Sequence, residues 1–168
     1  MHPYMTSSWK ILLVLILPLL PQLQTRTDGV PSDIGPLKLV RSLQGKEAQS
    51  FLDRLHEKEV APKTSLMGQY SSNAYHATLY VSVYETPALA AVASRRMAAR
   101  IKSGNPVFPH YSETTIRGLT ISRCLGLGQV HMFFLLRDSV YWLAVDPFIA
   151  APSLDALVNT LVSIPAQQ

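Results

Sequence analysis

Apolar and polar residues alternate most regularly between residues 119 and 145, LTISRCLGLGQVHMFFLLRDSVYWLAV. Alternation with a period of two is typical of β-strands that have one covered face. Glycines and an Asp-Ser pair interrupt the pattern. The stretch is therefore predicted to form three strands, joined by turns centred on Leu127-Gly128 and Asp138-Ser139. We expect this three-stranded meander to be the centre of the fold.

The two predicted turns determine which residues of the meander face each other. The first turn pairs Cys124 with His131, and the second pairs His131 with Asp146. The first face then carries mainly apolar side chains, which we expect helices to cover: Leu119, Ile121, Leu125, Val130, Met132, Phe134, Leu136, Tyr141, Leu143 and Val145, interrupted by Arg123. The second face is mixed and carries Thr120, Ser122, Cys124, His131, Phe133, Leu135, Trp142, Ala144 and Asp146.

Helices and further strands are predicted on both sides of the meander. Apolar positions three and four residues apart predict helices over residues 46–56 and 153–164. Residues 65–70, 75–84 and 113–116 are predicted strands.

The strongest helix signal lies between these strands, over residues 86–102. Thr86 is a good N-cap, Pro87 suits the first helical position, and Gly104 provides a left-handed stop. The side chains expected on its buried side are Leu89, Val92, Ala93, Met97 and Ile101. Its second half is basic and carries Arg95, Arg96, Arg100 and Lys102, where the helix dipole favours cations.

The element order is therefore α-β-β-α-β-β-β-β-α. Adjacent strands with tight connections predict an antiparallel sheet of about five to six strands, with the helices packed on one face, which is an α+β fold. Residues 45–168 are predicted to form this single domain. Residues 25–44 are expected to be a lead-in segment, because residues 29–36 are rich in glycine and proline.

Residues 1–24 have the order of a secretory signal peptide. Lys10 precedes the uncharged apolar run 11–20, ILLVLILPLL, and a polar exit follows. A membrane span needs about 20 apolar residues, so this run is too short for one. We expect cleavage near Gln24 and export to the periplasm or the extracellular space, with an uncleaved N-terminal anchor as the alternative. Membrane association is expected only through this segment, if it stays uncleaved.

Charge and motif spacing exclude several kinds of partner. The chain is 48% hydrophobic, with a net charge of +4, and its basic residues form no run typical of a nucleic-acid arm. The histidines lack metal-ligand spacing, so no metal is predicted. Gly126 and Gly128 lack the third glycine of a dinucleotide-binding loop, because His131 stands in its place. No cofactor is therefore predicted.

The only cysteine, Cys124, suggests one catalytic hypothesis. Cys124, His131 and Asp146 would form a row of nucleophile, base and orienting carboxylate, as a thiol-dependent hydrolase or transferase requires. Two facts favour a structural role instead. Reactive thiols usually lie at helix N-termini or beside cations, and a lone cysteine is commonly a buried apolar residue.

The second face suggests a binding hypothesis. Phe133, Leu135 and Trp142, with His131 and Gln129 beside them, would form an apolar patch that could bind a partner. Alternatively, the loop over residues 105–111 or the first helix covers this patch. We expect a non-enzymatic binding module of the cell envelope or extracellular space. Its partner would be an unknown protein, an envelope component or a small ligand.

One motif resembles a known pattern. The run GLGQVHMFF (126–134), followed by WLAVDP (142–147), is similar to a G-x-G-Q-x-H-x-F-F strand-turn motif of small, uncharacterised exported bacterial proteins. The segment 45–58 resembles that pattern too, and the similarity covers most of residues 45–160. The resemblance implies a compact exported domain of a family with no assigned activity, and it assigns no catalytic residue.

Overall fold

The computed structural model describes residues 26–27, 29–52 and 62–163. The expected signal segment lies outside these residues, as does the end of the helix predicted over 46–56. Among the helices that are described, none is both long and apolar enough to cross a membrane.

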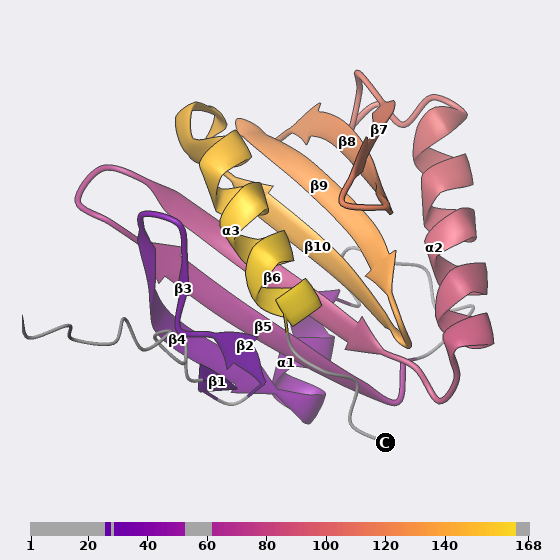
Figure 1. The fold of residues 1–168 in the computed structure, drawn as a ribbon. Helices are drawn as coiled ribbons and strands as arrows, with labels where there is room; N and C mark the ends of the chain where they lie inside the picture. The colour runs from indigo at the N-terminus through magenta and orange to yellow at the C-terminus, as the bar shows by residue number, and fades with distance from the viewer. Residues whose placement is uncertain (1–25, 28, 53–61, 164–168) are drawn as a thin grey trace, which may run out of the picture.

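The described residues form an eight-stranded antiparallel sheet with the strand order β3-β4-β5-β6-β10-β9-β8-β7 (Figure 1). The strands are β3 (Asp33–Ile34), β4 (Leu37–Gln44), β5 (Thr64–Ser71), β6 (His76–Val83), β7 (Ser112–Ile116), β8 (Leu119–Gly126), β9 (Gln129–Leu136) and β10 (Ser139–Val145). The helices are α1 (Gly45–Leu52), α2 (Pro87–Lys102) and α3 (Ala150–Ser163), with a 3-10 turn, η1 (Pro147–Ile149), before α3. The α+β class is confirmed, but five to six strands was too few.

The first face of the meander carries the main core, as predicted. Ile121, Phe134 and Leu143 are buried there with residues from β6. Helix α3 crosses this face and buries its own apolar stripe against it, at Leu154, Leu157, Val158 and Leu161 (Figure 1). Every apolar residue of the meander that was predicted on the first face belongs to this core or packs against it.

The prediction that all helices pack on one face was wrong. Phe51 of α1 packs near Met67 and Tyr80, and Met97 and Ile101 of α2 pack near Phe133, which lies on the second face. The sheet is apolar on both sides in its centre. Each side therefore needs a covering layer to keep these side chains from water.

Helix α2 begins and ends as predicted, and Ala93, Met97 and Ile101 face inward as expected, but Leu89 does not. The Thr86 hydroxyl accepts a hydrogen bond from the backbone N–H of Leu89 at 3.2 Å, and Pro87 is the first helical residue. The inward side carries Ala90, Met97 and Ile101. Leu89 was expected on that side, but it is 43% exposed.

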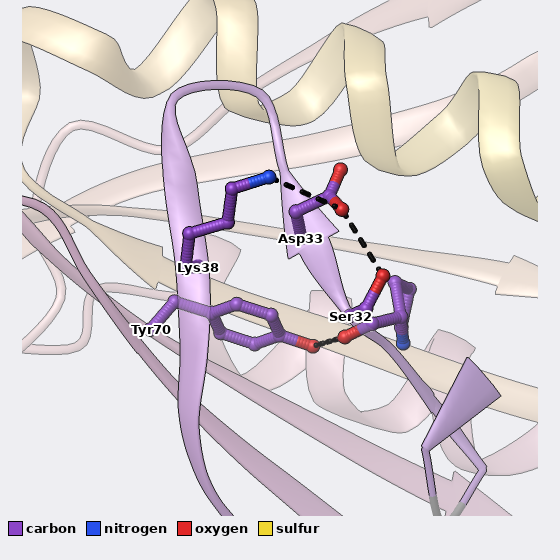
Figure 2. A network of polar contacts seen from close by, with 5 residues as sticks. Ser32, Asp33, Lys38 and Tyr70 are labelled. Carbon is purple, nitrogen blue, oxygen red and sulfur yellow. Dashed lines mark hydrogen bonds and ion pairs between the residues drawn. The ribbon is translucent and has the colours of Figure 1, made fainter. Parts of the chain in front are cut away.

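The expected lead-in segment forms strands, and its second half, β3 and β4, is part of the sheet. Strands β1 (Arg26–Thr27) and β2 (Val30–Pro31) form a separate ribbon, while β3 pairs with β4. Figure 2 shows how this region is held: the Tyr70 hydroxyl donates to the Pro31 carbonyl at 2.9 Å, and the Lys38 ammonium lies 3.6 Å from the Asp33 carboxylate. The prediction of an irregular lead-in was wrong because isolated buried residues, such as Val30 and Ile34, show no periodicity.

The register of the meander is as predicted between β8 and β9 but not between β9 and β10. The turn at Leu127-Gly128 is confirmed, and it pairs Cys124 with His131. The second turn lies at Arg137-Asp138 instead of Asp138-Ser139, so His131 pairs with Ala144 and not with Asp146. Arg137 adopts a left-handed conformation with φ of 59°, which its residue type does not indicate.

Candidate functional site

The predicted patch on the second face is covered by the protein itself. Phe133 is 1% exposed and Trp142 is 7% exposed, and their rings stack with centroids 5.2 Å apart. Phe108, from the loop over residues 105–111, packs edge-on against Trp142 at 5.4 Å. We call this segment the cover loop. Of the two alternatives that the sequence left open, the structure therefore supports coverage by the loop, together with helix α2.

The cover loop is held by hydrogen bonds within itself and by hydrogen bonds to the sheet. Asn105 accepts hydrogen bonds from the backbone N–H groups of Val107 and Phe108, at 2.8 and 3.2 Å. The backbone N–H of Leu125 donates to the Pro109 carbonyl at 2.9 Å. The Tyr111 hydroxyl contacts the Ser122 hydroxyl at 3.0 Å and donates to Glu113. The Asn105 bonds hold the first half of the loop together, and the bonds of Pro109 and Tyr111 attach its second half to the sheet.

His131 is a buried neutral side chain with both ring nitrogens occupied. The Trp142 indole N–H donates to its Nδ1 at 3.0 Å. Because Nδ1 is the acceptor, the ring proton lies on Nε2, which donates to the Gly126 carbonyl at 2.9 Å. Burial lowers the pKa of His131, against the opposing effect of that backbone hydrogen bond. His131 is therefore engaged in the structure of the cluster and has no nitrogen left to act as a base.

Cys124 lies opposite His131, as predicted, but it is not an activated thiol. Its side chain is completely buried with Phe133 and Trp142. Burial raises the pKa of the Cys124 thiol to about 11, despite the opposing charge of Arg123. The thiol is therefore protonated at neutral pH, whereas a nucleophile needs the thiolate.

Asp146 does not complete the predicted catalytic row. Its carboxylate accepts a hydrogen bond from the backbone N–H of His76 at 2.6 Å, and its own N–H donates to the His76 carbonyl at 3.1 Å. Asp146 thus closes the end of the β6–β10 pairing. The prediction that Asp146 faces His131 was wrong, because the turn at Arg137-Asp138 moves β10 by two residues.

The other predicted binding residues are also partly or wholly covered. Leu135 is half-buried beside α2, where it packs near Val140. Gln129 is half-buried at the start of β9, opposite Gly126. Within the described ranges, no three His, Cys, Asp or Glu side chains lie close enough together to hold a metal ion.

A surface hollow at one end of the sheet was not predicted. It is shallow and open to solvent, with a volume of about 590 Å³, and it is lined by Pro36, Lys38, residues 71–75 at the β5–β6 connection, and Ile149. Next to it, Phe148 is 86% exposed, with its ring 6.4 Å from the ring of Tyr75. One signal in the sequence could have indicated this site, an aromatic residue directly after the Asp146-Pro147 pair that ends a strand.

Comparisons with protein-family models, curated proteins and solved structures each found no match for this chain. The resemblance to small exported bacterial proteins therefore stays a prediction from the residues alone.

The chemistry of Cys124 leads to a direct prediction. An Ellman-type reagent at pH 8 is expected to label native Cys124 at least about 100-fold more slowly than the unfolded chain. A thiol with a pKa of about 11 instead of 9.0 has roughly a hundredth of the thiolate, and burial slows access further. The unfolded reference is the same chain in concentrated guanidinium. Native labelling as fast as this reference would revive the thiol-enzyme hypothesis.

Proposed function

We propose that this protein is an exported, non-catalytic binding module of the cell envelope or extracellular space. Its binding site is the hollow beside Phe148, at the sheet end where β5 meets β6. The partner is a protein segment, envelope component or small ligand that offers an apolar group together with a hydrogen-bond acceptor or carboxylate. The second face of the meander, which the sequence first suggested as the binding site, is covered by the cover loop and has a structural role.

The exposure of Phe148 is the observation that carries this proposal. An aromatic side chain buries about 150–250 Å² when it is covered, so leaving one in water forgoes substantial stabilisation. Phe148 lies next to a concave surface, and aromatic residues at such positions are the usual anchors of binding sites.

The lining of the hollow supports a ligand of mixed character. Pro36, Tyr75 and Ile149 provide apolar contacts, and Ser71, Ser72 and Asn73 provide hydroxyl and amide groups. The Lys38 side chain is mostly exposed, although it lies near Asp33. An ammonium group at the edge of an apolar hollow favours an anionic or hydrogen-bond-accepting group on the ligand.

Export is supported by the n-h-c order of residues 1–24. A single cysteine is compatible with an oxidising compartment, because it cannot form a disulfide within the chain.

Site-specific photocrosslinking tests the proposal. Benzoylphenylalanine replaces Phe148 in the full chain, produced in the cells that export it, and crosslinking is triggered by light. The expected result is a crosslinked product of one discrete mass, with a yield that falls severalfold when Lys38→Ala is added.

The matched control places the same photoreactive residue at Val162. This residue is also exposed and lies 14 residues further on, near the other end of α3. Equal products from positions 148 and 162 would indicate nonspecific contact and contradict the proposal. The absence of any product from position 148 would contradict it too.

A further inference from the structure

Helix α2 presents an unusual outward face. Five of its exposed residues are Leu89, Arg95, Arg96, Arg100 and Lys102, and Val92 is half-exposed on the same side. The whole helix contains no acidic residue. Exposed helix faces of soluble proteins usually mix both signs of charge with neutral polar groups, whereas this one is almost entirely apolar or cationic.

Packing against the sheet explains why this face points outward. Ala90, Met97 and Ile101 follow the helical repeat of about 3.6 residues and lie against the second face of the sheet. The arginines at 95 and 96 lie on the opposite side of the helix. Figure 1 shows α2 along one flank of the molecule, on the side of β9 and β7 in this view, and α2 contacts β10 and β9.

The outward face changes character along the helix axis. Its first half is apolar, with Leu89 and Val92, and its second half carries four cations within eight residues. Near the cationic end the cover loop brings Val107, which is exposed, against Gly126. Leu127, which follows Gly126 in the chain, is 72% exposed at the tip of the β8–β9 turn. Exposed apolar side chains therefore precede the cationic row on the helix and follow it in the cover loop.

We propose that the outer face of α2 docks on the surface of an anionic lipid bilayer. Cations beside exposed leucine and valine are the pattern of helices that lie in the interfacial region, where arginine and lysine contact phosphate headgroups and apolar side chains enter the acyl boundary. A nucleic acid would also attract the cations. It would leave Leu89 and Val107 without an apolar environment, and the face offers no aromatic residue on which bases could stack. The lipid surface is the occupant that uses both kinds of side chain.

Vesicle binding tests this proposal with the purified full chain. The probes are vesicles of phosphatidylcholine alone and vesicles with one-third phosphatidylglycerol, at low and at physiological salt. Phosphatidylcholine also measures any binding through the apolar run 11–20, which every variant shares. The expected result is stronger binding to the anionic vesicles, weakened by salt.

Two charge-matched double variants separate a specific surface from net charge. Arg95→Gln with Lys102→Gln is expected to weaken anionic-vesicle binding about 25-fold, at roughly fivefold per cation. Arg41→Gln with Lys46→Gln removes the same charge from exposed positions on β4 and α1, and is expected to change binding less than about threefold. Far-UV circular dichroism and thermal unfolding confirm that both variants are folded.

A third variant, Leu89→Gln, tests the apolar contribution, and it is expected to lower the binding that survives high salt. Equal losses in the two charge variants would overturn the proposal, as would equal binding to both kinds of vesicle. Tighter binding to duplex DNA than to anionic vesicles, with the same dependence on Arg95 and Lys102, would assign the face to nucleic acid instead. Phe148→Ala should leave vesicle binding unchanged, which separates this site from the hollow.

Discussion

Replacement of Phe133 by alanine is expected to lower the free energy of unfolding by about 3–5 kcal/mol, as is typical of a fully buried phenylalanine. Phe133 belongs to β9, and its side chain packs under the layer formed by α2 and the cover loop. Its ring is nearly parallel to that of Trp142, at an interplanar angle of 7°. Truncation removes this stacking and leaves a cavity that the surrounding strands cannot close. Urea unfolding monitored by tryptophan fluorescence measures the change.

Phe148→Ala is the matched control, because it deletes the same ring from an exposed position. Its free energy of unfolding is expected to stay within about 0.5 kcal/mol of the native value. Comparable small effects for both variants would mean that the second face is open to solvent, as the binding hypothesis for Phe133, Leu135 and Trp142 assumed. A large loss in Phe148→Ala would mean that this ring contributes to the core, which would remove the main support for the binding site beside it.

The faces of the meander could be predicted from the sequence, but half of its register could not. A strand has a period of two, so a register error of two residues leaves every side chain on the same face. Leu143 and Val145 are therefore buried on the first face although the second turn was misplaced. The same shift of two residues does separate His131 from Asp146. A catalytic row depends on which residues pair, and not only on which face they share.

The turn itself explains the error. Asp138 and Ser139 are typical turn residues, and Leu127-Gly128 has a glycine that accepts a positive φ. Arg137 adopts a positive φ without a glycine, which is uncommon for a long side chain. Nothing in the residue types favoured this position over the next one. A single unfavourable backbone conformation was thus enough to change the functional interpretation of three residues.

The layer that covers the second face could not be predicted from the sequence pattern either. The period of α2 indicates an amphipathic helix, but its short apolar residues allow more than one orientation. Met97 and Ile101 were placed correctly on the inner side, whereas Leu89 was not. The position of Phe108 depends on the path of a loop with two prolines and no regular structure, and periodicity contains no information on such a path.

The covered cluster places the chemistry-bearing residues in structural roles. His131 accepts a hydrogen bond from the Trp142 indole N–H and donates one to the Gly126 carbonyl, which satisfies two buried polar groups at once. Cys124 fills space beneath Tyr111 and Phe108. Residues that suggest catalysis in a sequence can thus serve a core, and exposure distinguishes the two roles better than residue type. By this criterion, we propose the hollow near Phe148 and the outer face of α2 as the surfaces for function.

Gly126→Ala is expected to displace the cover loop and to destabilise the protein by about 1–3 kcal/mol. A Cβ at this position would lie 2.5 Å from the Val107 carbonyl oxygen and 2.7 Å from the Phe108 ring. The first of these atoms belongs to the backbone, so the clash cannot be relieved by rotating a side chain. The loop must move outward, and with it the ring that covers His131 and Trp142.

Gly128→Ala, in the same hairpin, provides the comparison. No atom lies within 4 Å of the added Cβ, but the φ of +77° is unfavourable for alanine, so a stability loss of about 1–2 kcal/mol is expected here too. Stability alone therefore does not separate the two variants. The rate at which Cys124 reacts with a thiol reagent under native conditions does. It should rise at least about tenfold in Gly126→Ala, because an outward loop exposes the thiol, and much less in Gly128→Ala. Equal rates in the two variants would mean that the cover loop does not control access to the buried cluster, and that helix α2 alone protects Cys124.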